Sequence, residues 1–263
     1  MGIQAQLSWL DEFRTAVERY YQHRPKDPFT EWFRQRRSEG GFVDDQHTIV
    51  TILAQARFDQ LSWSHTAVEN TKMVYPLLAK SKLSLEEVPR LKSIQYRKPE
   101  DWRRLFYEAH PYLRSTAKSI LDRKEWAAPQ LEELIAGIPE MDAKTSRVAV
   151  KLLLELVPDI VSIDVQEARV PIDRLVYRVA CRLGIVDPET DKLGSPSADR
   201  KIQEFAELAF PGEPLKIDEP MWSVGRSRGY GGYCYPTDPQ CEGCLFESFC
   251  FKSYRDRDPS PVG

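Results

Sequence analysis

Residues 233–250 read YCYPTDPQCEGCLFESFC, and this stretch carries four of the five cysteines of the chain. The four follow the spacing C-x6-C-x2-C-x5-C and are Cys234, Cys241, Cys244 and Cys250. Thiols this close in sequence can bind a metal centre or form two disulfides. Residues 1–10 lack the basic start and apolar core of a secretion signal. We therefore expect a protein that is not secreted but cytoplasmic or associated with the nucleoid, where thiols stay reduced.

The cysteine spacing also indicates which metal centre to expect. Only Cys241 and Cys244 have the two-residue spacing of a zinc knuckle, whereas structural zinc sites usually have two such pairs. An iron–sulfur cube fits better, because its four iron corners need thiolates spread around an object larger than one ion. We therefore expect a [4Fe-4S] cluster, with zinc or two disulfides as the alternatives.

This spacing resembles the cysteine loop of the endonuclease III and MutY-like DNA glycosylases of the helix-hairpin-helix superfamily. The resemblance extends over about residues 48–250. It implies a two-lobed, all-α helix-hairpin-helix DNA glycosylase fold with an iron–sulfur cluster loop. It also implies double-stranded DNA as the partner, bearing a damaged or mismatched base or an abasic site. We expect the protein to act as a monomer.

Composition limits the classes of function. The chain has 263 residues, 41% of them hydrophobic and 29% charged, which is ordinary for a globular protein with a substantial core. No apolar run reaches the roughly 18 residues of a membrane span, so we expect no membrane partner. Lys and Arg number 37 against 40 Asp and Glu, a net charge of −3. Any DNA-binding surface must therefore be local.

The apolar residues recur mostly at three- and four-residue steps, which predicts an all-α protein. We expect helices at residues 4–23, around Trp32, and at 45–59, 64–80, 84–91, 99–124, 131–138, 143–157, 172–183 and 197–210. Gly184 should be the C-cap of the helix at 172–183. Pro111 should break or kink the helix that contains it. Residues 45–157 are expected to form a six-helix barrel-like lobe with the helical hairpin. Residues 1–44 and 158–252 should form a cluster lobe, and 253–263 a flexible tail.

The hairpin segment 138–153, IPEMDAKTSRVAVKLL, resembles the family motif in which a proline and two glycines precede a lysine at the start of the second helix. Lys144 has the place of that lysine. The resemblance implies that its neutral amine attacks C1′ of a damaged nucleoside, expels the base and forms a Schiff base, after which β-elimination cuts the strand. Burial or a nearby positive charge would favour the neutral amine. A solvated lysine in a first helical turn is the structural alternative.

Residues 170–184, VPIDRLVYRVACRLG, resemble the family segment that enters a helix with a catalytic aspartate. Asp173 matches that aspartate, and the resemblance implies that it stabilises an oxocarbenium-like sugar or assists the lysine. We expect Lys144 and Asp173 on opposite walls of a cleft between the lobes. An N-cap that serves only the helix is the alternative for Asp173. Asp164 offers a second register, and an insertion near residues 161–168 is implied.

Four further residues are candidates for contact with DNA. By the resemblance, Gln55 in LAQARFD would fill the gap left by a flipped nucleotide, and Tyr112 would be near the intercalating wedge. Their structural alternatives are a satisfied buried amide and core packing. Arg226 and Arg228, in the glycine-rich stretch before the cysteines, could meet phosphates, unless that stretch is only a connector.

The hairpin departs from the family where two glycines should let backbone N–H groups approach a phosphate, because this chain has Glu140 and Asp142 there. We nevertheless expect a base-excision DNA glycosylase with AP-lyase activity. MutY-like adenine removal fits less well, since a lysine has the nucleophile position and no recognition domain follows Cys250. The alternatives are a non-catalytic or damage-sensing DNA binder on the same scaffold, and a glycosylase-like enzyme acting on RNA or nucleosides.

Overall fold

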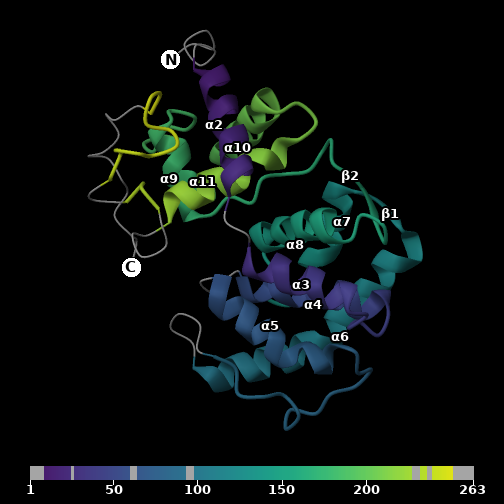
Figure 1. The fold of residues 1–263 in the computed structure, drawn as a ribbon. Helices are drawn as coiled ribbons and strands as arrows, with labels where there is room; N and C mark the ends of the chain where they lie inside the picture. The colour runs from purple at the N-terminus through teal and green to yellow at the C-terminus, as the bar shows by residue number, and fades with distance from the viewer. Residues whose placement is uncertain are drawn as a thin grey trace. The chain divides into compact units, whose positions relative to one another are not determined.

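The computed structural model describes residues 9–24, 27–59, 64–92, 98–226, 232–235 and 239–250. The described part is mostly helical with a single two-stranded sheet, in agreement with the all-α class (Figure 1). The chain forms two compact units. Unit 1 consists of residues 1–24 and 168–263, and unit 2 of residues 25–167.

Unit 2 contains six of the described helices and both strands. Its elements are α3 (Pro28–Ser38), α4 (Asp45–Asp59), α5 (Ser64–Leu78), α6 (Pro99–Arg123), β1 (Glu125–Ala127), α7 (Ala128–Ala136), α8 (Ala143–Leu156) and β2 (Ser162–Asp164). Helix α4 lies at its centre, because every residue from His47 to Phe58 is buried and the helix packs against α5, α6 and α8. A helix that is buried all round belongs in a core, and α4 buries polar side chains such as Gln55 and Arg57 along with its apolar ones.

Helices α7 and α8 lie side by side and form the predicted helical hairpin (Figure 1). The connection between them is residues 137–142. A buried ion pair also joins the two helices, with Arg147 Nε 3.7 Å from a carboxylate oxygen of Glu132. Burying such a pair is costly unless the geometry holds both charges together, so it favours one relative position of the two helices.

The unit boundary differs from the one expected from the sequence, because α3 and residues 158–167 belong to unit 2. Strand β2 pairs in parallel with β1, and the register places Trp126 opposite Ile163. Helix α3 buries Phe29 and Phe33, and its Arg37 donates to Asp159 at 2.9 Å. Long-range pairing of this kind joins segments that composition alone would separate.

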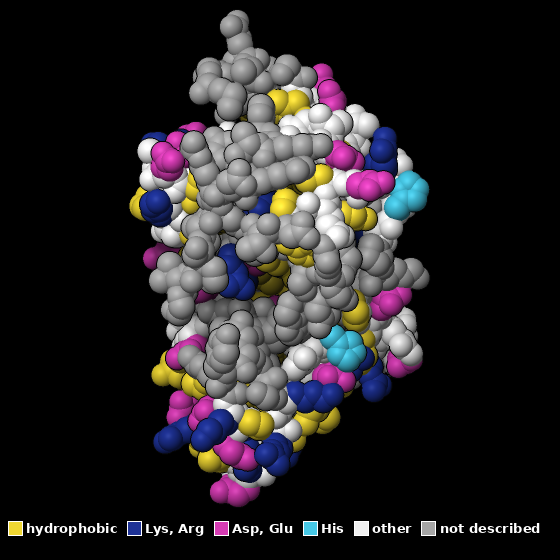
Figure 2. Space-filling view, turned by 90° about the vertical axis from the view of Figure 1, so that its left-hand side faces the viewer, with side chains coloured by type: hydrophobic (Ala, Val, Ile, Leu, Met, Phe, Trp, Pro, Cys, Tyr) yellow, Lys and Arg dark blue, Asp and Glu magenta, His cyan; other side chains and the backbone are white. Residues whose placement is uncertain are grey.

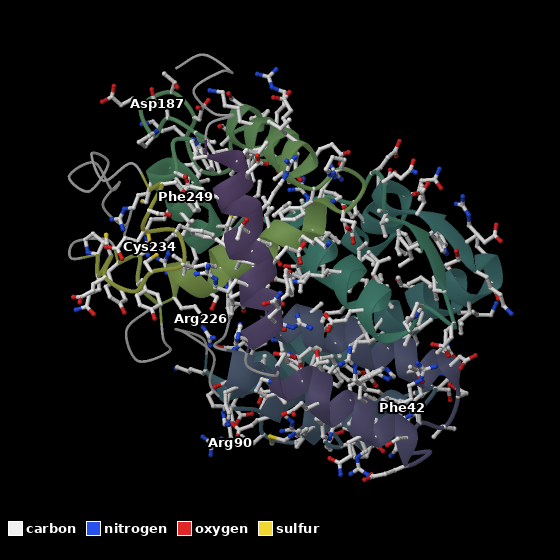
Figure 3. All side chains as sticks on the ribbon, turned by 45° about the horizontal axis from the view of Figure 1, so that its top comes forward. Phe42, Arg90, Asp187, Arg226, Cys234 and Phe249 are labelled. Carbon is white, nitrogen blue, oxygen red and sulfur yellow. The ribbon has the colours of Figure 1, made fainter. Side chains whose placement is uncertain are left out.

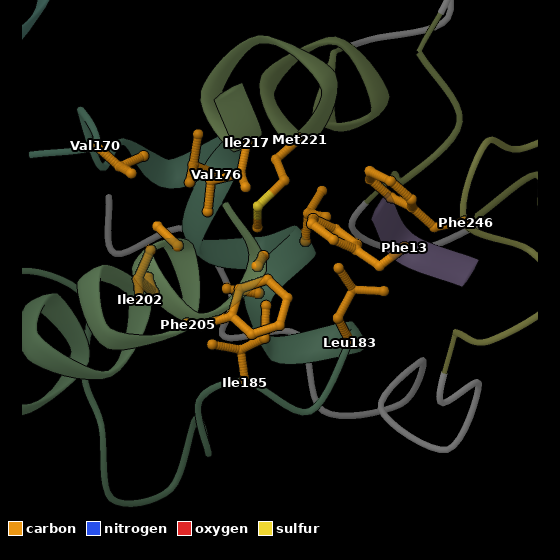
Figure 4. Close-up of a cluster of buried hydrophobic side chains, with 14 of the residues drawn as sticks. Phe13, Val170, Val176, Leu183, Ile185, Ile202, Phe205, Ile217, Met221 and Phe246 are labelled. Atoms are coloured by element: carbon orange, nitrogen blue, oxygen red, sulfur yellow. The ribbon is translucent and has the colours of Figure 1, made fainter. Parts of the chain in front are cut away.

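Unit 1 contains α2 (Leu10–His23), α9 (Arg174–Arg182), α10 (Pro196–Ala209), the 3₁₀ turn η1 (Pro214–Ile217) and α11 (Asp218–Gly225). Its core joins side chains from α2, α9, α10, α11 and the cysteine segment (Figure 4). Aromatic rings connect the first and last parts of the unit. The rings of Trp9 and Phe249 stack at 5.5 Å and those of Phe13 and Phe246 at 5.3 Å. The C-terminal cysteine segment is therefore packed onto α2.

The helix expected at residues 84–91 is wrong, and so is a break of the helix at Pro111. Residues 84–91 form a turn rather than a helix. The Glu87 carboxylate accepts from Ser84 N at 2.7 Å, as in a capping box, but Pro89 disfavours helical backbone at the preceding residue, so the turn ends there. In contrast, α6 continues through Pro111. Pro111 and Tyr107 are both exposed, so the carbonyl that loses its partner faces solvent and can bind water.

The surface that the structure describes has mixed charge. Over the face drawn in Figure 2, the described Lys and Arg side chains are interspersed with Asp and Glu. Among the described side chains of that face, such mixing favours no large field of one sign, as the net charge predicts. None of the helices in the described ranges combines the length and the apolar composition needed to cross a membrane.

Candidate functional site

The four cysteines of residues 233–250 border one cavity in unit 1. Cys234, Cys241, Cys244 and Cys250 line it together with Arg182, around ≈ 420 Å³ of space free of protein atoms, part of it open to solvent. All four thiols are free rather than disulfide-bonded. Cys234 lies in the same part of the unit as Phe249, whose ring packs on α2 (Figure 3). The fold therefore brings together the residues that the spacing singled out.

Within the described ranges, no three or more His, Cys, Asp or Glu side chains converge on a point where a single metal ion could bind. A zinc ion needs donors about 2.3 Å from one point, whereas a cubane cluster needs sulfurs spread around its corners. Four thiols around a shared cavity fit the second requirement better than the first.

The electrostatics of the cavity also fit a cationic cluster core. Burial, and to a lesser extent the neighbouring thiols with Cys234 first, raise the pKa of the Cys244 thiol to about 11 and that of Cys250 to about 12. Four thiolates so close together repel one another in a buried site. Bound metal cations offset this repulsion, because a coordinated thiol is deprotonated outright.

Helix α9 holds the cysteine segment through two buried arginines that the sequence analysis did not assign to the site. Arg182 Nη1 donates to Cys234 Sγ at 3.0 Å, and Arg178 Nη1 donates to the Cys234 carbonyl at 3.0 Å. Cys250 Sγ donates to the Arg182 carbonyl at 3.5 Å. A guanidinium beside a sulfur ligand favours the thiolate. The sequence signal that could have found them is a row of arginines at four-residue steps, Arg174, Arg178 and Arg182, in a helix whose other residues are apolar or tyrosine.

Asp173 is the N-cap of α9. Its Oδ1 accepts from Leu175 N at 2.8 Å and from Val176 N at 2.9 Å, so Asp173 does cap the helix, while a catalytic role besides stays a prediction. Asp164, the alternative, is exposed at the end of β2 and accepts from Gln166 N at 3.0 Å. Asp173 belongs to unit 1 and Lys144 to unit 2, so a pairing of the two stays a prediction.

Lys144 is half-buried in the first turn of α8. In the turn before it, Glu140 has φ +64°, in the left-handed region that glycine favours. This is the position where the hairpin pattern resembled in sequence has a glycine. Asp142 is the N-cap of α8, and its Oδ1 accepts from Thr145 N at 2.8 Å and from Thr145 Oγ1 at 2.7 Å. The two acidic residues therefore differ, since Asp142 stabilises the helix start while Glu140 takes up an unfavourable conformation.

A polar network lies at the C-terminal end of α4 in the same unit. Gln55 is 1% exposed, donates to Asp59 Oδ2 at 2.9 Å and accepts from Thr71 Oγ1 at 2.8 Å. These contacts are those of a satisfied buried amide, while a role in filling a gap in DNA stays a prediction. Burial raises the pKa of Asp59 to about 7, against the opposing effect of the Gln55 hydrogen bond. Asp59 is thus a titratable residue that the sequence analysis did not select.

The remaining candidates are placed as follows. Tyr112 on α6 is 49% exposed, so its core-packing alternative is wrong and its side chain is available to a partner. The guanidinium of Arg226 lies 4.5 Å from the centre of the Trp222 ring at the end of α11. A stacked arginine of this kind can still present N–H groups at its edge. Arg228 lies outside the described residues.

Comparison with protein-family models and with curated proteins finds no match to this chain.

Proposed function

We propose that this protein is a base-excision DNA glycosylase with AP-lyase activity, built on the helix-hairpin-helix glycosylase fold. The observation that carries the proposal is the placement of Lys144. This half-buried amine belongs to the second residue of α8, the second hairpin helix, which Asp142 caps. The hydrogen-bonded pair Gln55 and Asp59 lies on α4, which packs against that helix.

In the proposed reaction, Lys144 Nζ bonds to C1′ of the damaged nucleoside while the glycosidic bond breaks and the base leaves with the electron pair. The resulting Schiff base makes the C2′ proton acidic, and its loss expels the 3′ oxygen, which cuts the strand. Asp173 would stabilise the positive charge that develops on the sugar. Tyr112, Arg226 and Gln55 would contact the bent duplex around the flipped nucleotide.

Cys234, Cys241, Cys244 and Cys250 would hold a [4Fe-4S] cluster, which would cross-link the C-terminal segment to α9 rather than take part in base removal. The cavity, the thiol set and Arg182 support this assignment. Iron and sulfide analysis of the purified protein tests it. About four irons and four sulfides per chain are expected, and one zinc with no iron contradicts it.

The enzyme proposal is tested by borohydride trapping on a duplex that contains an abasic site. Wild-type protein should form a covalent adduct, and Lys144→Ala should abolish it. Lys151→Ala is the matched control, because residue 151 lies two turns along the same helix and shares the face of Lys144. Adduct formation that survives in Lys144→Ala, or is lost equally in both variants, would contradict the role of Lys144.

A second candidate is a non-catalytic DNA binder on the same scaffold. Glu140 favours it, because an exposed carboxylate in the hairpin turn opposes a phosphate near the helix start. Tight binding of a lesion-containing duplex without any trapped adduct would favour this candidate over the enzyme. A panel of duplexes with oxidised, deaminated and alkylated bases then distinguishes the preferred lesion.

A further inference from the structure

Arg182 is the last residue of α9, and its guanidinium lies against one of the four cysteines. Its Nη1 donates to Cys234 Sγ at 3.0 Å, and the residue is only 4% exposed. Its backbone lies beside a second cysteine, because Cys250 Sγ is 3.5 Å from the Arg182 carbonyl oxygen. Arg182 therefore contacts two of the four thiols, one through its charged side chain and one through its main chain.

The described residues around this cavity carry few other charges. Apart from the cysteines, they include one basic side chain, that of Arg182, and one carboxylate, that of Glu247. Glu247 is half-buried and accepts from Gly243 N at 3.2 Å. The rest of the described lining is apolar or uncharged. Charges in such surroundings are poorly screened, so both side chains act strongly on whatever the cysteines bind.

We propose that Arg182 raises the reduction potential of the [4Fe-4S] cluster that the four cysteines would hold, and so protects it against oxidation. A cation that donates to a sulfur ligand stabilises the state with more negative charge. Oxidation from [4Fe-4S]²⁺ to [4Fe-4S]³⁺ gives one electron to an oxidant such as hexacyanoferrate(III) and removes part of that charge. The contact of Arg182 with Cys234 therefore opposes this oxidation. The inference rests on the proposed cluster and not on the AP-lyase activity.

Two backbone hydrogen bonds hold Cys234 in place without Arg182. Cys234 N donates to the Val224 carbonyl at 2.9 Å, and Arg178 Nη1 donates to the Cys234 carbonyl at 3.0 Å. Arg182→Met removes the charge and the N–H donors but keeps an unbranched side chain that fills irregular buried space. This variant should therefore still bind iron, and a change in its potential would report the lost contact rather than a lost ligand.

The test is voltammetry of the purified protein without DNA, after iron and sulfide analysis of each variant. At the potential where half of the wild-type clusters are oxidised, the ratio of oxidised to reduced cluster in Arg182→Met should be about tenfold higher, a downward shift of about 59 mV for one electron. Arg182→Lys keeps the charge and should recover part of this shift. Arg182→Gln repeats the test with a neutral side chain that keeps an N–H donor, and its potential should also fall below that of wild type.

Two further variants are matched controls for charge. Glu247→Gln removes a carboxylate from the same cavity, so it should shift the potential upward. Arg174→Met removes an exposed arginine from the start of the same helix. Residue 174 lies about 12 Å from residue 182 along the helix axis. Solvent and salt screen an exposed charge over that distance, so Arg174→Met should leave the potential unchanged.

The outcomes distinguish the inference from the proposals beside it. An unchanged potential in iron-loaded Arg182→Met, or a shift that Arg174→Met reproduces, overturns the inference and leaves the cluster assignment intact. Loss of iron from both neutral variants of Arg182, with normal loading in wild type, assigns the residue to assembly of the site and also overturns it. Wild-type protein without iron overturns the cluster assignment and this inference together. If the potential shifts as expected but borohydride traps no abasic DNA, the role of Arg182 is supported and the AP-lyase proposal fails.

Discussion

Replacement of Glu140 by glycine should both stabilise the protein and tighten its binding to DNA. Glu140 has φ +64° in the hairpin turn, a conformation that costs an L-residue about 1–2 kcal/mol. Glycine removes this cost but gains about 0.4–1 kcal/mol of freedom in the unfolded chain. The expected net gain in the free energy of unfolding is therefore about 0.5–1 kcal/mol.

The effect on DNA comes from charge rather than backbone. If the hairpin turn meets a phosphate as the proposed function requires, removing its exposed carboxylate should tighten binding by about two- to fivefold at low salt, since exposed charge interactions contribute about 0.5–1 kcal/mol. The gain should shrink as salt is added, because screening shortens the reach of surface charges. Fluorescence anisotropy with a labelled abasic duplex at two salt concentrations measures both quantities.

Two control variants separate the backbone effect from the charge effect. Glu140→Gln removes the charge but keeps the strained backbone, so it should tighten DNA binding without stabilising the protein. Lys124→Gly tests the backbone effect elsewhere in unit 2, because Lys124 has φ +62° at the end of α6. Urea unfolding measures both. The reasoning is refuted if Glu140→Gly lowers the free energy of unfolding while Lys124→Gly raises it, or if Glu140→Gln binds DNA more weakly than wild type.

Three other sets of variants test the contacts within unit 2. Asp142→Ala should cost about 1 kcal/mol of unfolding free energy by removing the N-cap of α8, and Asp142→Ser should retain most of it in the same urea titration. Glu132→Gln should cost about 3–5 kcal/mol by leaving the buried Arg147 charge uncompensated, and a Glu132→Leu, Arg147→Leu double variant should recover much of that loss. Because the pKa of Asp59 is raised to about 7, its folded carboxyl favours the protonated state, so its contribution to stability is present below about pH 4 and is lost as pH rises through about 7. Asp59→Asn should therefore gain stability over wild type at alkaline pH but not at about pH 4, as thermal melts across pH would show.

The features predicted well are those that depend on neighbours in sequence. The hairpin helices, the N-cap at Asp173 and the left-handed Gly184 after α9 all follow from local backbone chemistry. The two wrong expectations about helices also have local causes, which the spacing of apolar residues does not show. Pro89 ends a turn that the capping pattern had begun, and the exposure of Pro111 lets α6 continue.

The features that the sequence analysis did not predict depend on packing between distant segments. Arg182 meets Cys234 across 52 positions of the chain, and Gly225 is required because a Cβ there would lie 2.8 Å from Leu175 Cβ. Strand β1 pairs with β2 across the whole hairpin, which moves residues 158–167 into unit 2. A local sequence pattern cannot predict contacts between residues so far apart in the chain, since these contacts depend on how the folded helices pack.

By itself, the sequence determined the helical class, the helical hairpin with Lys144 in its second helix, and the set of four cysteines that suits a cluster, because each depends on residue type and spacing along the chain. Only the tertiary structure showed that the four cysteines line one cavity beside Arg182, and that burial raises the pKa of Asp59 while Gln55 holds its carboxylate. The physical reason is that the protonation of a carboxyl and the chemistry of a thiol depend on burial and on neighbouring charges, and these exist only once the helices have packed.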